Sequence, residues 1–166
     1  PNSAPPTEGN QMKRKHYVIV GLAAILGLFV GSALAAPSSP IASLLARGTV
    51  GSLDAEHQGV EVEREGSADH VVAKVTFPPG SSVGWHRHPG VVLVTVASGS
   101  VQHIEANCER ETFETGESFV EDGNVHLVRN RGTEEAVVYA TWILPTKTPS
   151  DGLTIPVDAP EGCSVQ

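Results

Sequence analysis

The sequence is poor in cysteine and in basic side chains. Its 166 residues include only two cysteines, Cys108 and Cys163, and these form no C-x-x-C pair, which argues against thiol redox chemistry. Lysine and arginine number 11 against 19 aspartate and glutamate residues, so the formal net charge is −8. Because such a surface repels phosphate backbones, we expect no nucleic-acid partner.

Several sequence patterns of common enzymes are also missing. The chain contains no G-x-S-x-G, which argues against a nucleophilic serine of the hydrolase type. No glycine-rich stretch lies between an expected strand and an expected helix, so the sequence predicts no phosphate-binding loop. No helical periodicity is sustained after Arg47, and the remaining chain is therefore expected to be β-structure.

The N-terminal region has the features of an export signal. Residues 1–11 are predicted to be a disordered extension, and residues 12–35 a signal peptide with a basic start, an uncharged run over Tyr17–Val30 and the Ala-x-Ala end Ala33–Ala35. The alternative is an uncleaved anchor, because the uncharged stretch approaches the roughly 20 residues that span a bilayer. The prediction is a secreted or periplasmic protein, whose only contact with the membrane would be an uncleaved signal.

The remaining chain divides into three parts. Residues 36–57 are predicted to be a linker with a short helix, because apolar residues of Ile41–Arg47 have nearly helical spacing. Residues 58–145 are predicted to be an antiparallel barrel and residues 146–166 an irregular, proline-rich strap. Short Val-, Thr- and Ile-rich segments bounded by Gly and Pro give the expected strands: Val60–Arg64, Val71–Phe77, Val91–Ala97, Val101–Glu105, Ser118–Glu121, His126–Arg129 and Ala136–Leu144.

The segment Val91–Val96 is apolar at every position except Thr95, which is typical of a strand covered on both faces. Its even-numbered residues would share the inward face of the preceding histidines, so Val92, Val94 and Val96 are expected to line the interior. A second subunit, forming a homodimer, is one candidate to cover the outer face.

The two cysteines are expected to bond to each other. In an exported chain a Cys108–Cys163 disulfide is the natural prediction, and it would fasten the C-terminal strap to the barrel.

Three histidines carry the clearest chemical signal. His86 and His88 are two residues apart, so on a strand they project from the same face. A third imidazole from a neighbouring strand, that of His126, would complete a metal site, and imidazoles in this pattern suit Fe, Zn, Cu or Ni. The alternative is a set of polar residues that line the barrel without a metal.

Two motifs around these histidines resemble those of the cupin superfamily. The first, G-x5-H-x-H-x3,4-E-x6-G, is matched by Gly80, His86, His88 and Gly99. The second, G-x5-P-x-G-x2-H-x3-N, is matched by Gly116, Gly123, His126 and Asn130, with one residue fewer and with Glu121 in place of the usual proline. The resemblance implies an all-β, antiparallel double-stranded β-helix, or jelly roll. It also implies a divalent transition metal (Fe, Zn, Cu, Ni or Mn) on His86, His88 and His126.

One departure from the first motif affects the chemistry. Val92 stands where the family has its glutamate ligand, which predicts a centre of three neutral imidazoles, with His103 or Glu105 as candidate extra ligands. Two functions remain open. One is an oxygenase-type or Lewis-acid metalloenzyme for a small organic substrate. The other is a barrel that binds or senses a small molecule or the metal without turnover, since a fold alone does not determine function.

Overall fold

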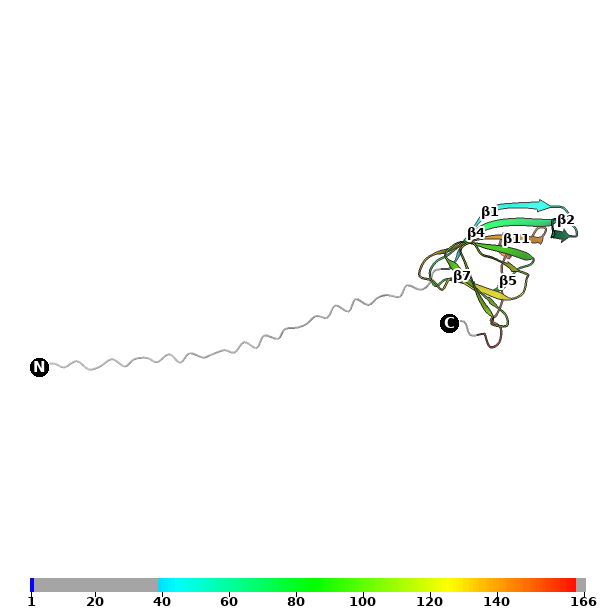
Figure 1. Ribbon diagram of the computed structural model, residues 1–166. Coiled ribbons are helices and arrows are strands. Elements are labelled where there is room, and N and C mark those ends of the chain that lie inside the picture. Colours follow the sequence, from blue (N-terminus) through cyan, green and yellow to red (C-terminus); the bar gives the residue numbers. More distant parts are fainter. Residues whose placement is uncertain (2–38, 164–166) are drawn as a thin grey trace. The chain divides into compact units, whose positions relative to one another are not determined.

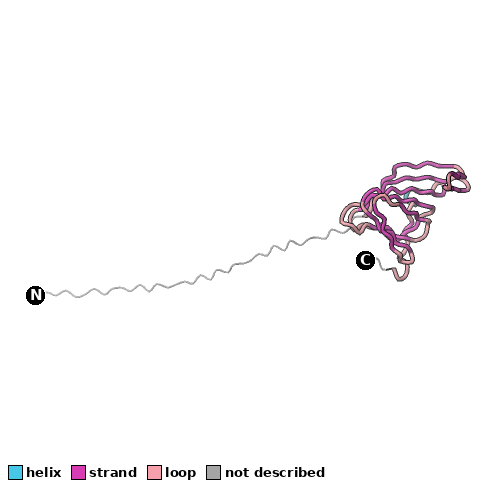
Figure 2. Tube along the Cα trace, in the orientation of Figure 1, coloured by secondary structure: helices cyan, strands magenta, loops and turns pink. Residues whose placement is uncertain are grey.

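Two facing five-stranded antiparallel sheets dominate the protein. The computed structural model describes Pro1 and residues 39–163, and its strands enclose a barrel (Figures 1 and 2). The first sheet consists, in spatial order, of β1 (Ile41–Val50), β4 (Ala68–Phe77), β11 (Ala136–Pro145), β6 (Val91–Ser98) and β9 (Ser118–Glu121). The second consists of β12 (Ile155–Pro156), β5 (Ser82–Arg87), β10 (His126–Arg129), β7 (Ser100–Glu105) and β8 (Arg110–Glu114).

A hairpin extends the first sheet. Strands β2 (Leu53–His57) and β3 (Val60–Arg64) pair only with each other among the described strands. They continue the β1–β4 ribbon beyond the barrel (Figure 1). The jelly-roll architecture expected from the two motifs is confirmed.

The alternating burial of β6 shows how the core forms. Val92, Val94 and Val96 face inward and are buried, as expected from their parity, and they join the apolar cluster between the two sheets. The outward residues differ from the expectation, because Val91 and Leu93 keep 40% and 47% of their surface exposed. The described chain does not itself cover this face, and the homodimer stays a prediction.

Gly90 allows the chain to turn closely between β5 and β6. A Cβ atom at this position would lie 2.1 Å from the carbonyl oxygen of Ile143. The histidine-bearing strand can therefore pass directly into β6 only because residue 90 has no side chain.

The short helix predicted over Ile41–Arg47 is wrong. These residues belong to β1, which pairs antiparallel with β4 from Ile41 opposite Thr76 to Val50 opposite Ala68. The ladder with β4, which is interrupted only by a register shift between Leu44 and Ala46, outweighs a local apolar spacing that is compatible with a helix, because tertiary pairing overrides weak local propensity. The part of the chain that the structure describes contains no α-helix, only a single 3₁₀ turn over Ser150–Gly152.

The C-terminal segment includes the two-residue strand β12. Residues 146–163 are called the strap below. β12 pairs with β5 at the edge of the second sheet, and further along, Val157 and Cys163 pack with Trp85, Ile104 and Leu127 in a second apolar cluster. Cys163 forms the expected disulfide with Cys108, which is typical of proteins in an oxidising compartment.

The predicted extension and signal fall on residues 1–35, which lie, apart from Pro1, outside the described part of the chain. Within the described part, no helix has the length and apolar character needed to cross a membrane.

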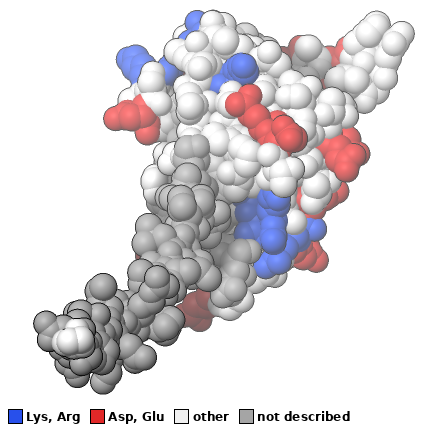
Figure 3. Space-filling view, turned by 90° about the vertical axis from the view of Figure 1, so that its left-hand side faces the viewer, with Lys and Arg blue, Asp and Glu red and all other residues white. Residues whose placement is uncertain are grey.

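Charged side chains are dispersed on the face of the molecule seen in Figure 3. Acidic and basic groups lie in several small areas, some of which adjoin one another. This face therefore offers no continuous basic surface of the kind that follows a phosphate backbone, and the absence of a nucleic-acid partner stays a prediction.

Asp69 fastens the start of the strap to the first sheet, and its titration is expected to appear in the stability. Its carboxylate accepts hydrogen bonds from Arg47, Thr49 and the backbone N–H of Lys147. The hydrogen bond from Arg47, followed by that from Thr49, lowers the pKa of Asp69 below its ordinary value of 3.8. The folded state therefore holds this proton less tightly than the unfolded state, and the stabilisation is present above the ordinary pKa and is lost as the pH falls below it.

Asp69→Asn is accordingly expected to lower the free energy of unfolding at pH 7, with the difference from wild type shrinking towards about pH 3. Urea denaturation at both pH values measures this. A difference independent of pH would show that the carboxylate charge is not what stabilises the strap.

Candidate metal centre

The ladder pairing of the second sheet places two of the three histidines side by side. His126 of β10 is the direct partner of His86 of β5, and His88 follows at the end of β5. The ring centroids of His86 and His126 lie 4.3 Å apart, and that of His88 lies 4.8 and 5.2 Å from them. All three side chains are buried. The structure thus brings together the three histidines identified from their spacing.

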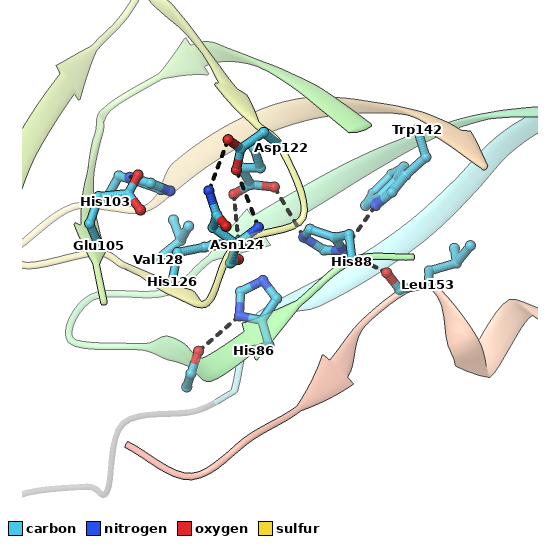
Figure 4. Close-up of polar contacts among 12 residues, drawn as sticks. His86, His88, His103, Glu105, Asp122, Asn124, His126, Val128, Trp142 and Leu153 are labelled. Atoms are coloured by element: carbon cyan, nitrogen blue, oxygen red, sulfur yellow. Dashed lines mark hydrogen bonds and ion pairs between the residues drawn. The ribbon is translucent and has the colours of Figure 1, made fainter. Parts of the chain in front are cut away.

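Each of the three imidazoles is oriented through its Nδ1 atom. His86 Nδ1 lies 2.9 Å from the carbonyl oxygen of Gly84, and His126 Nδ1 lies 2.8 Å from that of Asn124. His88 Nδ1 lies 2.6 Å from the carbonyl oxygen of Leu153, as Figure 4 shows. A carbonyl can only accept, so Nδ1 of His86 and of His126 carries the proton. His88 Nδ1 also lies 3.3 Å from the Trp142 indole Nε1, which can only donate, but the Leu153 carbonyl is much closer and places the proton on Nδ1. Each neutral ring then keeps its lone pair on Nε2. A backbone carbonyl on the far nitrogen is the usual arrangement for metal-binding histidines.

Glu121 supplies the carboxylate that the first motif lacks. Its oxygens lie 3.1 Å from Nε2 of His88 and 3.1 Å from Nε2 of His126. The four candidate ligand atoms, one each from His86, His88, Glu121 and His126, lie within 4.8 Å of one another, and all four residues are buried. Glu121 therefore adds a carboxylate to the group of three histidines predicted from the sequence.

The pairing of β6 with β9 explains why Glu121 can bring a carboxylate to the three histidines although Val92 occupies the motif position. Glu121 of β9 is the ladder partner of Val92 of β6, so both side chains emerge on the same inner face of the first sheet. The carboxylate of this chain therefore lies on β9, one strand away from Val92, which occupies the motif position on β6. Sequence reasoning had only two signals for it: the replacement of the second motif's proline by Glu121, and the inward parity that it shares with Phe119.

Burial and mutual proximity shift the pKa values of His86, Glu121 and His126. Burial lowers the pKa of His86 to about 4, so at neutral pH its ring is in the uncharged form that binds metals. Burial alone would raise the pKa of Glu121, but the neighbouring rings of His126 and His88 outweigh it and lower that pKa to about 2. Burial also opposes a charge on His126, yet the adjacent Glu121 carboxylate raises the pKa of this ring.

The residues present fit a divalent transition metal. Nε2 of His126 is buried and makes no hydrogen bond of acceptable geometry, although it lies close to the Glu121 carboxylate. With Nδ1 protonated, the lone pairs of His88 and His126 face a carboxylate. That arrangement is repulsive unless a cation or extra protons lie between the groups. A cation bound by all four ligand atoms would satisfy every group at once.

The two candidate extra ligands lie beside this group and outside it. His103 of β7 is buried and stacks on His126 with a centroid distance of 5.1 Å. Its Nδ1 lies 3.4 Å from the Glu105 carboxylate, whose side chain keeps 45% of its surface exposed. Burial lowers the pKa of His103 and raises that of Glu105. Both residues border the group of converging side chains, whose fourth member is Glu121.

An apolar pocket of about 460 Å³ opens onto the centre. Its walls include Phe77, Phe119 and Trp142, and its lining contains neither lysine nor arginine. Of the three predicted lining valines, Val94 is part of the wall, whereas Val92 and Val96 belong to the buried core behind it. Among the lining residues, Asp151 is the only one with a titratable side chain besides His86, His88 and Glu121.

Comparison with known proteins agrees with the fold. Residues 73–143 match the family described as "Cupin domain", and no curated protein matches the chain significantly in sequence. A cupin domain from Bordetella pertussis is 21% identical, with a TM-score of 0.46, covering 66% of this chain and 97% of that one. A double-stranded β-helix protein from Klebsiella pneumoniae is also 21% identical, with a TM-score of 0.49 and coverages of 69% and 85%.

A third solved structure is described as a predicted oxalate decarboxylase from Thermotoga maritima. It is 24% identical, with a TM-score of 0.41, and covers 48% of this chain and 83% of that one. Sequence identities and TM-scores this low describe similarity of the barrel alone and give no information about a substrate.

Proposed function

Through residues 73–143 the chain belongs to the cupin superfamily, and we propose that it is an exported protein that binds a divalent transition metal. The ligands are His86, His88, His126 and Glu121. The observation that carries the proposal is the convergence of three imidazole Nε2 atoms and one carboxylate, with each Nδ1 fixed by a backbone carbonyl. The disulfide supports an oxidising location.

The pocket indicates which ligand would share the centre. Its volume accommodates a small organic molecule. The aromatic and aliphatic walls favour apolar groups, and the lack of lysine and arginine in the lining leaves an anionic group without a side-chain counter-ion. We therefore propose a small, uncharged, mostly apolar ligand with one oxygen directed at the metal.

The metal, when bound, supplies Lewis acidity towards such an oxygen. The remaining contributions come from the protein. Phe119, Val94 and Trp142 exclude water from the bound ligand, and Glu121 places one negative charge beside the centre. The pocket lining offers no buried acid or base outside the ligand group, since Asp151 is exposed. The geometry thus supports binding more directly than proton-transfer catalysis.

Cobalt titration tests this proposal. The metal-free protein is expected to bind one Co²⁺ per chain, with visible absorption bands that reveal histidine and carboxylate coordination. Adding a small uncharged alcohol with an apolar body, such as benzyl alcohol, is expected to change these bands saturably, because the pocket walls hold the ring while the hydroxyl faces the metal. Glycerol, which has no apolar body, serves as the control.

Failure to bind Co²⁺ would overturn the proposed metal centre. Equal responses to glycerol and benzyl alcohol would leave the metal centre intact and contradict the proposed ligand class.

A further inference from the structure

The three candidate histidine ligands differ in what holds them. His86 and His126 each donate to the carbonyl two residues earlier, in Gly84 and Asn124, so their orientation is fixed by the immediately preceding backbone. His88 instead donates to Leu153, 65 residues further along the chain. Only this ligand of the described site depends on a remote segment for its Nδ1 partner. Figure 4 shows the Leu153 carbonyl approaching the His88 ring from the strap.

The strap reaches this position by pairing with the strand that carries the ligands. Ile155 and Pro156 of β12 lie opposite Arg87 and His86 of β5. The backbone N–H of Val157 then donates to the carbonyl oxygen of Trp85 at 3.0 Å. Leu153 packs its side chain against the main core. The Leu153 carbonyl is therefore positioned by a short run of contacts along β5.

The disulfide limits how far the strap can move. β12 contains only two residues, too few for an independently stable strand. Beyond it, Cys163 is buried beside Trp85 and Leu127 and is bonded to Cys108, which lies between β7 and β8. The strap is thus held at its start by Asp69, through Lys147, and at its end by the disulfide.

We propose that the Cys108–Cys163 disulfide, acting through the strap and the Leu153 carbonyl, positions His88 as a metal ligand. This inference rests on the proposed metal centre. The carbonyl keeps the proton on Nδ1 and leaves the Nε2 lone pair directed at the metal. Losing such an outer partner typically weakens metal binding by about 10- to 100-fold. We expect about a tenfold loss in this protein, because a released strap can still return to β5.

The test compares wild type with the Cys108→Ser/Cys163→Ser double variant. The double variant is expected to bind Co²⁺ about tenfold more weakly in a chelator competition, with altered visible bands. Asp69→Asn is the matched control, since it releases the strap at Lys147, on the other side of Leu153, and leaves β12 and the disulfide in place. It should lower the unfolding temperature while leaving the cobalt Kd and bands unchanged. Equal weakening by Asp69→Asn, or an unchanged Kd in the double variant, would overturn the proposal.

A second variant and a spectroscopic measurement test the proposal if the double variant does not fold or if no metal binds. If the double variant does not fold, Val157→Pro removes the hydrogen bond to Trp85 while the disulfide stays intact, and the same weakening is expected.

In the metal-free protein, long-range ¹H–¹⁵N spectra report which nitrogen atoms of each imidazole ring carry a proton. Wild-type His88 should carry a proton on Nδ1, whether or not its Nε2 beside Glu121 is also protonated, and the double variant should show partial loss of the Nδ1 proton, whereas His86 and His126 should not change. Unchanged protonation of His88 Nδ1 would overturn the inference even if no metal binds, an outcome that separately refutes the proposed function.

Discussion

His86→Ala is expected to weaken Co²⁺ binding by more than about 100-fold, beyond the effect typical of outer-shell partners. The substitution removes an Nε2 lone pair that is held in place by the Gly84 carbonyl. The pKa of His86, about 4, means that the wild-type ring is uncharged and ready to bind at neutral pH. His103, the other buried histidine of the described chain, stacks on His126 and is not one of the four residues whose ligand atoms converge. Isothermal titration of metal-free protein measures the change.

His103→Ala is the matched control for this variant. Both residues are buried histidines in the second sheet, so both truncations leave a similar cavity and should lower the unfolding temperature to a similar degree. Only His86→Ala should lose the metal. If His103→Ala abolishes binding and His86→Ala does not, the proposed ligand set is wrong.

Glu121→Val is expected to weaken metal binding by about 100-fold, because it removes the one charged ligand of the centre. The substitution also leaves His88 and His126 without their acidic neighbour. In the metal-free protein the pKa of His126 should then fall, since burial opposes the charge and the carboxylate no longer offsets it. A ¹H–¹⁵N titration of the rings follows this change independently of any metal.

The pairing of Val92 with Glu121 allows a rescue experiment. The double variant Val92→Glu/Glu121→Val returns the carboxylate to the usual motif position on the neighbouring strand, on the same inner face. We expect it to recover most of the affinity lost in Glu121→Val. Val92→Glu alone should not tighten binding, because two buried carboxylates then repel each other. A folded double variant that binds no better than Glu121→Val would show that the carboxylate does not act from this face.

The elements that could be predicted are those specified by local pattern. The strand-forming residues of Ser118–Glu121 and His126–Arg129 and the turn residues that flank them predicted the bounds of β9 and β10 as observed. The i, i+2 spacing of His86 and His88 was sufficient to place both rings on one side of the chain. The inward parity of Val92 followed from the same rule.

The elements that escaped prediction depend on contacts between distant segments. Glu121 becomes a candidate ligand only through the register of β6 against β9, which no spacing within either strand reveals. The Leu153 carbonyl reaches His88 only because the strap pairs with β5. In the same way, Ile41–Arg47 becomes a strand because β4 is available to pair with it. Each case requires knowledge of which strand lies next to which.

Anomalous diffraction from crystals grown with Co²⁺ or Zn²⁺, recorded at the absorption edge of the metal, is the decisive experiment for the four-ligand centre. We expect one anomalous peak per chain, about 2.0–2.3 Å from Nε2 of His86, His88 and His126 and from a carboxylate oxygen of Glu121. No peak among these four side chains, or a peak bound by the three imidazoles with Glu121 turned away from it, would contradict the proposed centre.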